Sequence, residues 1–586
     1  MTPLTDARFK ALLFALIALA LLLLFVDKAV IWCSHPLLGY ADQTAYLDMA
    51  RLISQGKLPY VDFFEWNPPL IMYLNLLPIW LARLVHIPPT LALDYCVLAL
   101  TAVSSYFALW LIYQYGDEEN QIVLLPMLLG LVYFSQWQLP AMGEREHLLV
   151  LLYLPFFILR GLYWQGKGSP PTRNESIVSG LAAGLGLALK PQFLASAVLV
   201  ELVFWYQFRG NGRYRRPEIY AVASVFIAYF FSMLLLPQPV WQAYFGQVLP
   251  LYVSGLSYSS RALMTMLRGS GFDYPSFVQM ALTLPLSVVL SSASPWIAPL
   301  GVFALSFFFH YIYGDQVWPY RFLPMAAALV MLDALMLGLL LRLVALKLKI
   351  SRLLFSLMAA AAIVFSGYVC VSEMQGNSEY LETTKLMDLE QVGYCGKSPL
   401  DDLGPVAFSI LSHTKAEDKV IFMGTGIEPG YPAILESGRS CGSRYLFCPL
   451  PFIDYALEKE PGERWLAAEA RAIENYGEDI KANCPALIVI QENPIKPILD
   501  KNRFFDRFMA DYEPAEDIAG YFRAYVRSGR QAQSAASGAT PGRAPSGSPC
   551  RSSPAVESEL KQLKLQVNQL IEENSDLKQQ IERARK

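Results

Sequence analysis

Long apolar runs that carry almost no charge alternate with short polar connections over the first two thirds of the chain. The clearest runs are residues 14–26, 101–111, 194–204 and 326–341. A helix needs about 20 apolar residues to cross the hydrocarbon core of a bilayer, where its backbone polar groups have to be satisfied within the helix. The pattern therefore predicts a polytopic α-helical membrane protein with about eleven to thirteen spanning helices. The predicted spans are 9–27, 70–87, 90–113, 121–138, 147–164, 176–191, 193–208, 217–236, 276–292, 295–313, 320–341 and 353–372.

Lys and Arg residues collect in four regions and set the orientation of the helices, because positive residues are enriched on the cytoplasmic side. The connections 28–69 and 237–275, and the whole chain after residue 372, are then expected to face outward. This orientation requires an even number of crossings between the first outer loop and His147. Three predicted spans lie in this interval: 70–87, 90–113 and 121–138. One of them therefore does not cross the membrane fully, or its bounds are wrong. The basic regions contain Arg8 and Lys10; Arg160, Lys167 and Arg173; Arg209, Arg213, Arg215 and Arg216; and Arg342, Lys347, Lys349 and Arg352.

From about residue 373 the pattern becomes that of a soluble domain, which we place at 373–528. Residues 419–424 (KVIFMG) and 485–491 (PALIVIQ) are short β-rich runs bounded by turn residues, and they predict buried strands. A helical stretch at 463–476 lies between them, so we expect a small outward-facing α/β domain. Disulfide pairing is expected in such a domain, with three pairings open for its four cysteines. These are Cys395, Cys441, Cys448 and Cys484.

The end of the chain has two further segments. Residues 529–555 are rich in Ser, Ala, Gly and Pro and predict a disordered linker that cannot bury a core. In residues 556–586, apolar side chains recur with a seven-residue period, and Asn574 lies within the seam. This pattern favours a parallel two-stranded coiled coil and hence a homodimer. The alternative is a solvated amphipathic helix.

Composition narrows the classes of function. Hydrophobic residues make up 54% of the chain and charged residues 17%, whereas a soluble protein has roughly 25% charged residues. The net charge of −3 and the lack of a long basic run argue against a nucleic-acid partner. The aromatic content of 13% fits interfacial belts and a groove for an apolar ligand. Residues 1–372 are therefore a membrane domain whose partners include membrane lipids.

The first outer loop, residues 39–73, concentrates carboxylates beside the bilayer. A helix that starts just after Asp42 places apolar residues on one face and is expected to lie along the membrane surface. Asp42 is either an N-cap or a functional group, and Asp48 is expected on the wet side of the helix. Pro68-Pro69 ends the loop and starts the next helix. The loop's carboxylates are Asp42, Asp48, Asp62 and Glu65, and the apolar face contains Ala45, Met49, Leu52 and Ile53.

Three more sites with ionisable side chains lie at predicted outer ends of helices: the segment 143–147, Lys190 and Arg321. Residues 143–147 (GEREH) lead into an apolar helix, and such a cluster is costly at a membrane edge unless it serves a site or reaches water. Helix-dipole stabilisation explains its glutamates but not the whole cluster. Lys190 lies between two apolar runs and has to snorkel or pair with an anion. Arg321 follows an aromatic segment, 315–320, and is either a snorkelling belt residue or an anion contact.

In their order along the chain, these segments resemble the GT-C superfamily of membrane glycosyltransferases. The nearest branch is that related to protein O-mannosyltransferases and lipid A aminoarabinose transferases. The resemblance covers roughly residues 8–372 and starts with an acidic residue, Tyr-x-x-x-Ala-Arg, Gly-x-x-Pro-Tyr-x-Asp-Phe and Pro-Pro-Leu in the first outer loop. It continues with the Arg-Glu-His-Leu segment at 145–148, the Lys-Pro turn at Lys190 and the aromatic-Arg segment at 318–321. Where the family carries a Lys before the Pro pair, this chain has Trp66-Asn67.

The resemblance implies an active site at the outer membrane surface. Asp42 matches the family's catalytic carboxylate or lies beside it, and Lys190 and Arg321 match contacts to the lipid phosphate. The candidates for catalysis are Asp42, Glu146 and His147, and those for substrate or carrier binding are Tyr46, Glu65, Arg145, Lys190, Trp318 and Arg321. No cofactor is required; a Mg or Mn cation is optional, and its ligands would be Asp42, Glu144 and Glu146.

The expected function is transfer of a sugar from a polyprenyl-phosphate carrier to an acceptor outside a bacterial inner membrane. Asp42 acts as general base, and the transfer inverts the anomeric carbon. One alternative is a flippase or transporter, a class that often shows paired repeats and charges near the bilayer midplane. Another is a non-catalytic scaffold, which predicts that Asp42, Glu146 and Lys190 tolerate neutralisation.

Overall fold

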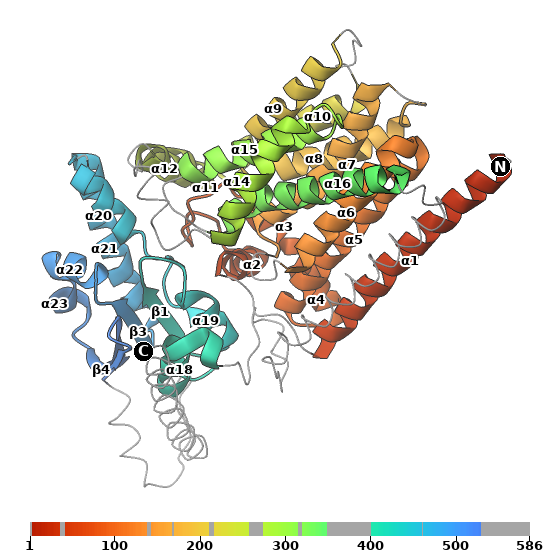
Figure 1. The fold of residues 1–586 in the computed structure, drawn as a ribbon. Helices are drawn as coiled ribbons and strands as arrows, with labels where there is room; N and C mark the ends of the chain where they lie inside the picture. Colours follow the sequence, from red (N-terminus) through yellow and green to blue (C-terminus); the bar gives the residue numbers. More distant parts are fainter. Residues whose placement is uncertain are drawn as a thin grey trace, which may run out of the picture.

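A helical bundle forms one end of the molecule and a small α/β domain the other (Figure 1). The structure is a computed structural model, and it describes residues 3–34, 41–137, 142–166, 169–209, 216–256, 274–313, 319–347, 400–459 and 461–528. The bundle contains α1 (Pro3–Ser34), α2 (Ala41–Ser54), α3 (Leu70–Leu74), α4 (Leu76–Val85), α5 (Pro89–Tyr115), α6 (Glu118–Trp137), α7 (Arg145–Gln165), α8 (Arg173–Ala188), α9 (Phe193–Gln207), α10 (Pro217–Leu234), α11 (Gln238–Ala243), η2 (Tyr244–Val248), α12 (Leu249–Leu256), α14 (Tyr274–Val289), α15 (Ile297–Tyr313), η3 (Pro319–Phe322) and α16 (Leu323–Lys347).

Eleven of the twelve predicted spans coincide with helices or helix pairs of this bundle, and 353–372 lies outside the described residues. Five helical segments are long and apolar enough to cross a membrane, and four apolar segments are shorter. The chain is therefore a multi-pass membrane protein. The five long segments are Lys10–Val30, Pro89–Tyr115, Arg145–Gln165, Pro217–Leu234 and Tyr320–Val344.

The segment 70–87, predicted as one span, is broken into α3 and α4. The break falls at Asn75, whose side-chain amide donates a hydrogen bond to the carbonyl of Ile71 at 2.9 Å. α3 and α4 together, Leu70–Val85, form one of the four shorter apolar segments. The number of crossings before His147 and the predicted orientation stay predictions.

Close helix packing holds the bundle together where small residues let backbones approach. On α8, a Cβ added at Gly180 would lie 2.2 Å from the carbonyl oxygen of Glu218 on α10. α1 packs along α5, and the hydroxyl of Tyr106 donates to the carbonyl of Ala18 at 2.8 Å. α7 is the most buried of the five long helices and packs against α5, α8 and α16. Both ends of α7 are consequently held firmly inside the bundle.

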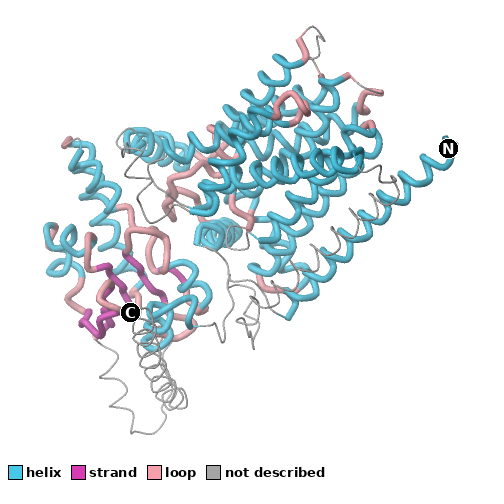
Figure 2. The backbone as a smooth tube through the Cα atoms, in the orientation of Figure 1, coloured by secondary structure: helices cyan, strands magenta, loops and turns pink. Residues whose placement is uncertain are grey.

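The C-terminal domain is built on a five-stranded sheet with the strand order β2-β1-β3-β5-β4. The strands lie in the part of the molecule away from the helical bundle (magenta in Figure 2). β1 pairs in parallel with both β2 and β3, and β5 pairs antiparallel with β3 and β4. β1 and β3 fall on the two predicted strands. The elements are α18 (Leu400–His413), β1 (Lys419–Met423), α19 (Gly430–Glu436), β2 (Ser440–Cys441), α20 (Leu450–Lys459), α21 (Glu463–Asn483), β3 (Leu487–Gln491), α22 (Ile495–Lys501), α23 (Phe504–Phe508), β4 (Tyr512–Ile518) and β5 (Phe522–Arg527).

The predicted disulfide pairing is wrong for the three described cysteines of this domain. Cys441, Cys448 and Cys484 are free thiols. The thiol of Cys441 donates to the carbonyl of Ser443 at 3.3 Å, and Cys484 is exposed at the end of α21. The fourth cysteine, Cys395, the linker 529–555 and the heptad segment 556–586 lie outside the described residues.

Candidate active site

The candidate site lies where the first turn of α2 meets the first turn of α7. Asp42 is in the first turn of α2, and its Oδ2 lies 3.9 Å from Nη2 of Arg145, the first residue of α7. The chain enters α7 through Gly143, whose φ of +84° favours glycine. The amide of Gly143 donates to Nδ1 of His147 at 3.1 Å, so this ring fixes the entry to α7. The unusual backbone of the GEREH segment thus places its charges against α2.

A second ion pair joins α7 to the turn between α8 and α9. The ammonium of Lys190 donates to Oε1 of Glu146, and both side chains are buried. Nζ of Lys190 also lies 5.2 Å from the ring centroid of Tyr320 in η3. Burial, together with the neighbouring charges of Arg145 and Arg321, lowers the pKa of Lys190 to about 8, although Glu146 opposes the shift. Lys190 is therefore a charge that an arriving anion would stabilise.

The aromatic side of the site is held by residues of the first outer loop. The guanidinium carbon of Arg145 lies 5.1 Å from the ring centroid of Tyr46. The amide of Asn67 donates to the Tyr46 hydroxyl at 3.0 Å and to Oε1 of Glu65 at 2.5 Å. Burial raises the pKa of Glu65 to about 7, against hydrogen bonds from Asn67 and the charge of Arg145. Asn67, the residue directly before the Pro pair, therefore links Glu65 to Tyr46.

Burial and neighbouring charges shift the pKa of the Asp42 carboxyl. Burial raises the pKa of its carboxyl most, and the charge of Glu146 raises it further. The charges of Arg145 and Lys190 and a hydrogen bond with the Tyr320 side chain oppose the shift. A carboxylate whose pKa is moved toward neutrality is a better acceptor of a substrate proton than one at its ordinary value.

Several buried polar atoms of the cluster lack a hydrogen-bond partner among the described residues. Buried polar atoms are normally satisfied, so such a group of exceptions calls for a physical reason. Burial first, and then the charge of Asp42, raises the pKa of Glu144 well above its ordinary value. We interpret these atoms as the lining of a ligand site. They are both carboxylate oxygens of Glu144, Nε and Nη1 of Arg145, Oε2 of Glu146 and Nε2 of His147.

Two solved structures of one membrane protein have a similar fold. The crystal structure of ArnT from Cupriavidus metallidurans bound to undecaprenyl phosphate matches with a TM-score of 0.51 and 13% sequence identity, over 87% of this chain and 97% of that chain. The apo structure of the same protein matches with a TM-score of 0.50 and 14% identity, over 89% and 98%. This chain therefore shares the fold of ArnT.

The sequence relationship behind this shared fold is remote. No family model and no curated protein matches the chain. The oligosaccharyltransferase of Archaeoglobus fulgidus, in complex with Zn and sulfate, matches over 80% of this chain and 68% of that chain with 13% identity. Its TM-score of 0.42 is too low to argue from. The likeness therefore establishes the architecture alone.

The fold brings most of the predicted site residues together. Arg321 lies close enough for its charge to lower the pKa of Lys190, and Trp318 lies outside the described residues. Tyr320, which touches both Asp42 and Lys190, was not predicted, because one Tyr in an aromatic belt gives no signal of its own. The predicted residues that the structure places at the cluster are Asp42, Tyr46, Glu65, Arg145, Glu146, His147 and Lys190.

Two expectations about α2 are wrong. Asp48 is buried rather than on a wet face, and it forms an ion pair with Arg51 at 2.6 Å. Residues 43–50 are buried on every side, so α2 is not a helix with one face in water. The reason is that α19 of the C-terminal domain covers the face that sequence periodicity leaves exposed.

The site residues do not form an evident metal-binding group. Among the residues that the structure describes, no group of three or more His, Cys, Asp and Glu side chains is placed to hold a metal ion. Two of the three carboxylates expected as metal ligands face cations of the protein instead: Asp42 faces Arg145, and Glu146 faces Lys190.

Proposed function

We propose that the chain is a glycosyltransferase that moves a sugar from a polyprenyl-phosphate carrier to an acceptor at the outer face of a bacterial inner membrane. The observation that carries the proposal is that Asp42 and Lys190 share their neighbours. Arg145 and Tyr320 contact Asp42, and the Tyr320 ring also lies next to the ammonium of Lys190. A base and a set of phosphate-binding cations then share one site. The match with ArnT, whose structure holds undecaprenyl phosphate, supports a carrier of this class.

The phosphate of the carrier would lie on Lys190 and Arg321. Lys is a compact charge that suits a phosphate, and Arg offers a fork of donors. As the sugar leaves, negative charge grows on the phosphate oxygen, and fixed cations in a water-poor site stabilise that charge more than water would. The unpartnered Nε and Nη1 of Arg145 are further donors for the same group.

Asp42 would take the proton of the acceptor. The acceptor oxygen then bonds to the anomeric carbon, the bond from this carbon to the phosphate oxygen breaks, and the electron pair leaves with the polyprenyl phosphate. Attack from the face opposite to the phosphate inverts the anomeric carbon. Tyr46 and Glu65 would shape the sugar-binding wall beside Arg145, and Glu146 would hold Lys190 in place between turnovers.

The remaining organisation of the chain is part of the proposal. The membrane domain would span 1–372, and the α/β domain at 373–528 would face the periplasm. Residues 556–586 would dimerise the chain through a coiled coil, joined by the linker 529–555. The buried unpartnered atoms of Glu144 and Arg145 favour an enzyme over a scaffold, because a scaffold needs no such cluster.

The test is Asp42→Asn in the full chain, reconstituted in lipid with donor lipids extracted from envelope membranes. A positioned general base contributes about 10²–10⁴-fold, so we expect a loss of that order in the release of undecaprenyl phosphate, with unchanged expression. Asp62→Asn is the matched control, because Asp62 is an exposed carboxylate of the same loop that accepts from the amide of Leu58 at 2.7 Å. Full activity of Asp42→Asn would refute the proposal. Mass spectrometry of copurified lipid would identify the donor.

A further inference from the structure

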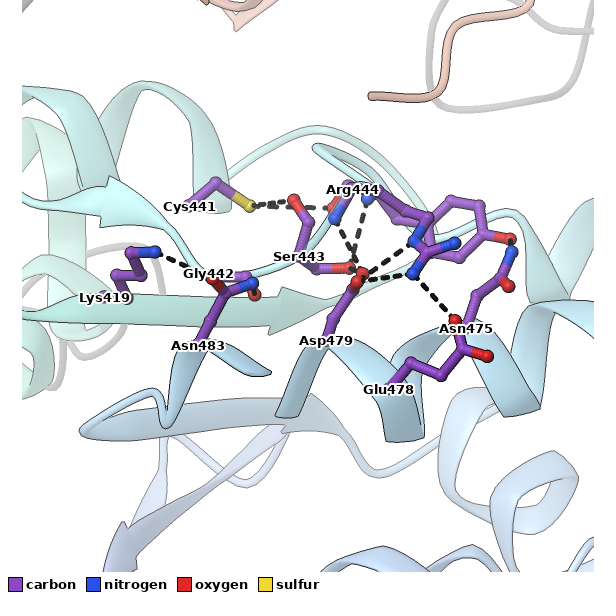
Figure 3. A network of polar contacts seen from close by, with 10 residues as sticks. Lys419, Cys441, Gly442, Ser443, Arg444, Asn475, Glu478, Asp479 and Asn483 are labelled. Carbon is purple, nitrogen blue, oxygen red and sulfur yellow. Dashed lines mark hydrogen bonds and ion pairs between the residues drawn. The ribbon is translucent and has the colours of Figure 1, made fainter. Parts of the chain in front are cut away.

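The C-terminal domain contacts the loop that follows α2. The amide of Phe64 donates to the carbonyl of Arg444 at 2.8 Å, and the rings of Trp66 and Phe452 lie 4.8 Å apart. The segment that presents this carbonyl is held in place, since Asp479 accepts hydrogen bonds from the amide and the guanidinium of Arg444 (Figure 3). The end of the first outer loop is therefore attached to the α/β domain.

A second contact joins the domain to α2 itself. The hydroxyl of Tyr431, the second residue of α19, donates to Oδ2 of Asp48 at 3.1 Å. Nε of Arg51 donates to Oδ1 of the same carboxylate at 2.7 Å. Tyr431 is 0% exposed and Asp48 is 1% exposed. A buried carboxylate needs its partners, so the hydroxyl of Tyr431 holds α2 against α19.

The helix α2 connects this contact to the candidate base. Asp42 and Asp48 are six residues apart, which corresponds to about 9 Å along a helix and about 240° around it. Asp48 faces the α/β domain, whereas Asp42 faces Arg145 at the start of α7. A rigid helix transmits a displacement from one side to the other. A shift of α2 at Asp48 would therefore change the position of the Asp42 carboxylate.

The cations of the site belong to other elements. Lys190 lies in the turn between α8 and α9, Arg321 is in η3, and the backbone of Arg145 is part of α7. Arg145 is the cation closest to α2, because it lies 3.9 Å from Asp42 and its guanidinium carbon lies 5.1 Å from the ring centroid of Tyr46. We therefore expect a change at the contact with α19 to move Asp42 more than it moves the set of cations.

We propose that Tyr431 is a positioning residue, whose hydrogen bond to Asp48 places Asp42 for the attack of the acceptor on the donor. The inference rests on the proposed glycosyl transfer, in which Asp42 is the base. A displacement of about 1 Å at a reacting group can lower a rate by on the order of 10²-fold, so a contact that fixes α2 affects the chemical step. The carrier phosphate would still meet Lys190 and Arg321. Loss of the contact should therefore lower the maximal rate much more than the affinity for the carrier.

The test compares Tyr431→Phe with Tyr521→Phe, which removes the hydroxyl of an exposed tyrosine of the same domain. Each full-length variant is reconstituted with extracted donor lipids and with envelope membranes from a strain that lacks this protein, which supply the acceptor. Tyr431→Phe keeps the ring and loses the bond to Asp48, so the maximal rate of undecaprenyl phosphate release should fall about tenfold. The affinity for undecaprenyl phosphate, measured on the same preparations, should stay near that of the parent.

A double variant shows whether Tyr431 acts through Asp48. Asp48→Asn alone should also lower the maximal rate. Adding Tyr431→Phe to it should cause little further loss, because both changes remove the same contact. A merely unstable domain would instead add its own loss, and the two effects would multiply.

Three results would overturn the inference. The first is a Tyr431→Phe rate equal to that of Tyr521→Phe, the second is a multiplied loss in the double variant, and the third is a fall in carrier affinity as large as the fall in rate. If Asp42→Asn is fully active, the proposed function itself fails. If Asp42→Asn is inactive while Tyr431→Phe keeps the rate of the parent, only the positioning role of Tyr431 fails.

Discussion

The two ends of α7 both carry buried charges, yet they are arranged in different ways. Near its C-terminal end, Arg160 uses all three guanidinium nitrogens: Nε and Nη2 donate to Glu201 at 2.8 and 2.7 Å, and Nη1 donates to Glu218 at 3.0 Å. Trp164 adds a further donor to Glu201 at 3.1 Å. At the N-terminal end, Arg145 makes one long ion pair of 3.9 Å and keeps two nitrogens without a partner among the described residues.

This difference indicates what each cluster is for. A buried charge needs partners, and the cluster around Arg160 supplies nearly all of them from within the protein, leaving Oε2 of Glu218 as an exception among its described atoms. Among the described residues, the cluster around Arg145 leaves donors and acceptors without a partner on four consecutive residues, 144–147. Under the proposed function, these groups are available to bind a phosphate and a sugar. We therefore predict that the Arg160 cluster serves stability and the Arg145 cluster serves binding.

The largest expected effect is on stability at the C-terminal end of α7. Removing one partner of a buried ion pair costs about 3–5 kcal/mol, so Arg160→Met should lower the unfolding temperature strongly. Thermal unfolding in detergent measures this. The triple variant that also carries Glu201→Gln and Glu218→Gln should regain most of the stability, because it leaves no buried charge unpaired. An Arg160→Met protein as stable as the parent would show that the Arg160 cluster does not stabilise the fold.

The matching change at the other end should affect binding instead. In the double variant Lys190→Met with Glu146→Gln, no charge is left unpaired, so stability should be equal or higher. Loss of a charge-assisted contact should weaken binding of undecaprenyl phosphate by about 10–100-fold. Binding to the reconstituted protein, measured beside its unfolding temperature, separates the two quantities. A fall in stability without a change in binding would assign the Lys190–Glu146 pair to stability instead.

The pH dependence of the rate should test the roles of Asp42 and Lys190 at the N-terminal end of α7. Asp42 has to be deprotonated to act as a base, and its raised pKa moves the acidic limb of the profile upward. Lys190 loses its charge as the pH rises through about 8, so carrier affinity should fall by up to about tenfold per pH unit above that value. Lys190→Arg should remove the alkaline limb, because Arg keeps its charge. An unchanged alkaline limb in this variant would exclude Lys190 as its cause.

The smallest expected effect concerns Tyr46. A cation–π contact contributes about 0.5–2 kcal/mol, so Tyr46→Leu should lower the rate by a few-fold to about 30-fold through a less well-placed Arg145. Tyr46→Phe keeps the ring and loses only the hydrogen bond from Asn67, so its rate should fall less. Equal losses in both variants would assign the effect to the hydroxyl rather than to the ring.

Much of the fold was predictable because an apolar run long enough to cross a bilayer is rarely anything but a membrane helix. The predicted spans and the strands at β1 and β3 follow from this kind of local signal. The burial of Asp48 was not predictable, because its partner Tyr431 is 383 residues away in the sequence. The break at Asn75 was also hidden, since the residues on either side are equally apolar.

The site itself was predicted where a charge interrupts an apolar run. Lys190 and the GEREH segment stand out for this reason, and the family resemblance added Asp42. Tyr320 gave no such signal, because an aromatic residue in an interfacial belt is common. Its importance depends on which elements the fold brings beside Asp42.

The short helix α4 has two different sides. It exposes Leu77, Trp80 and Leu84 by 61%, 59% and 79%, so one side is an apolar flank, while the other side packs against α2 and α5. The helix that carries Asp42 is thereby attached to a segment whose outer surface suits contact with lipid.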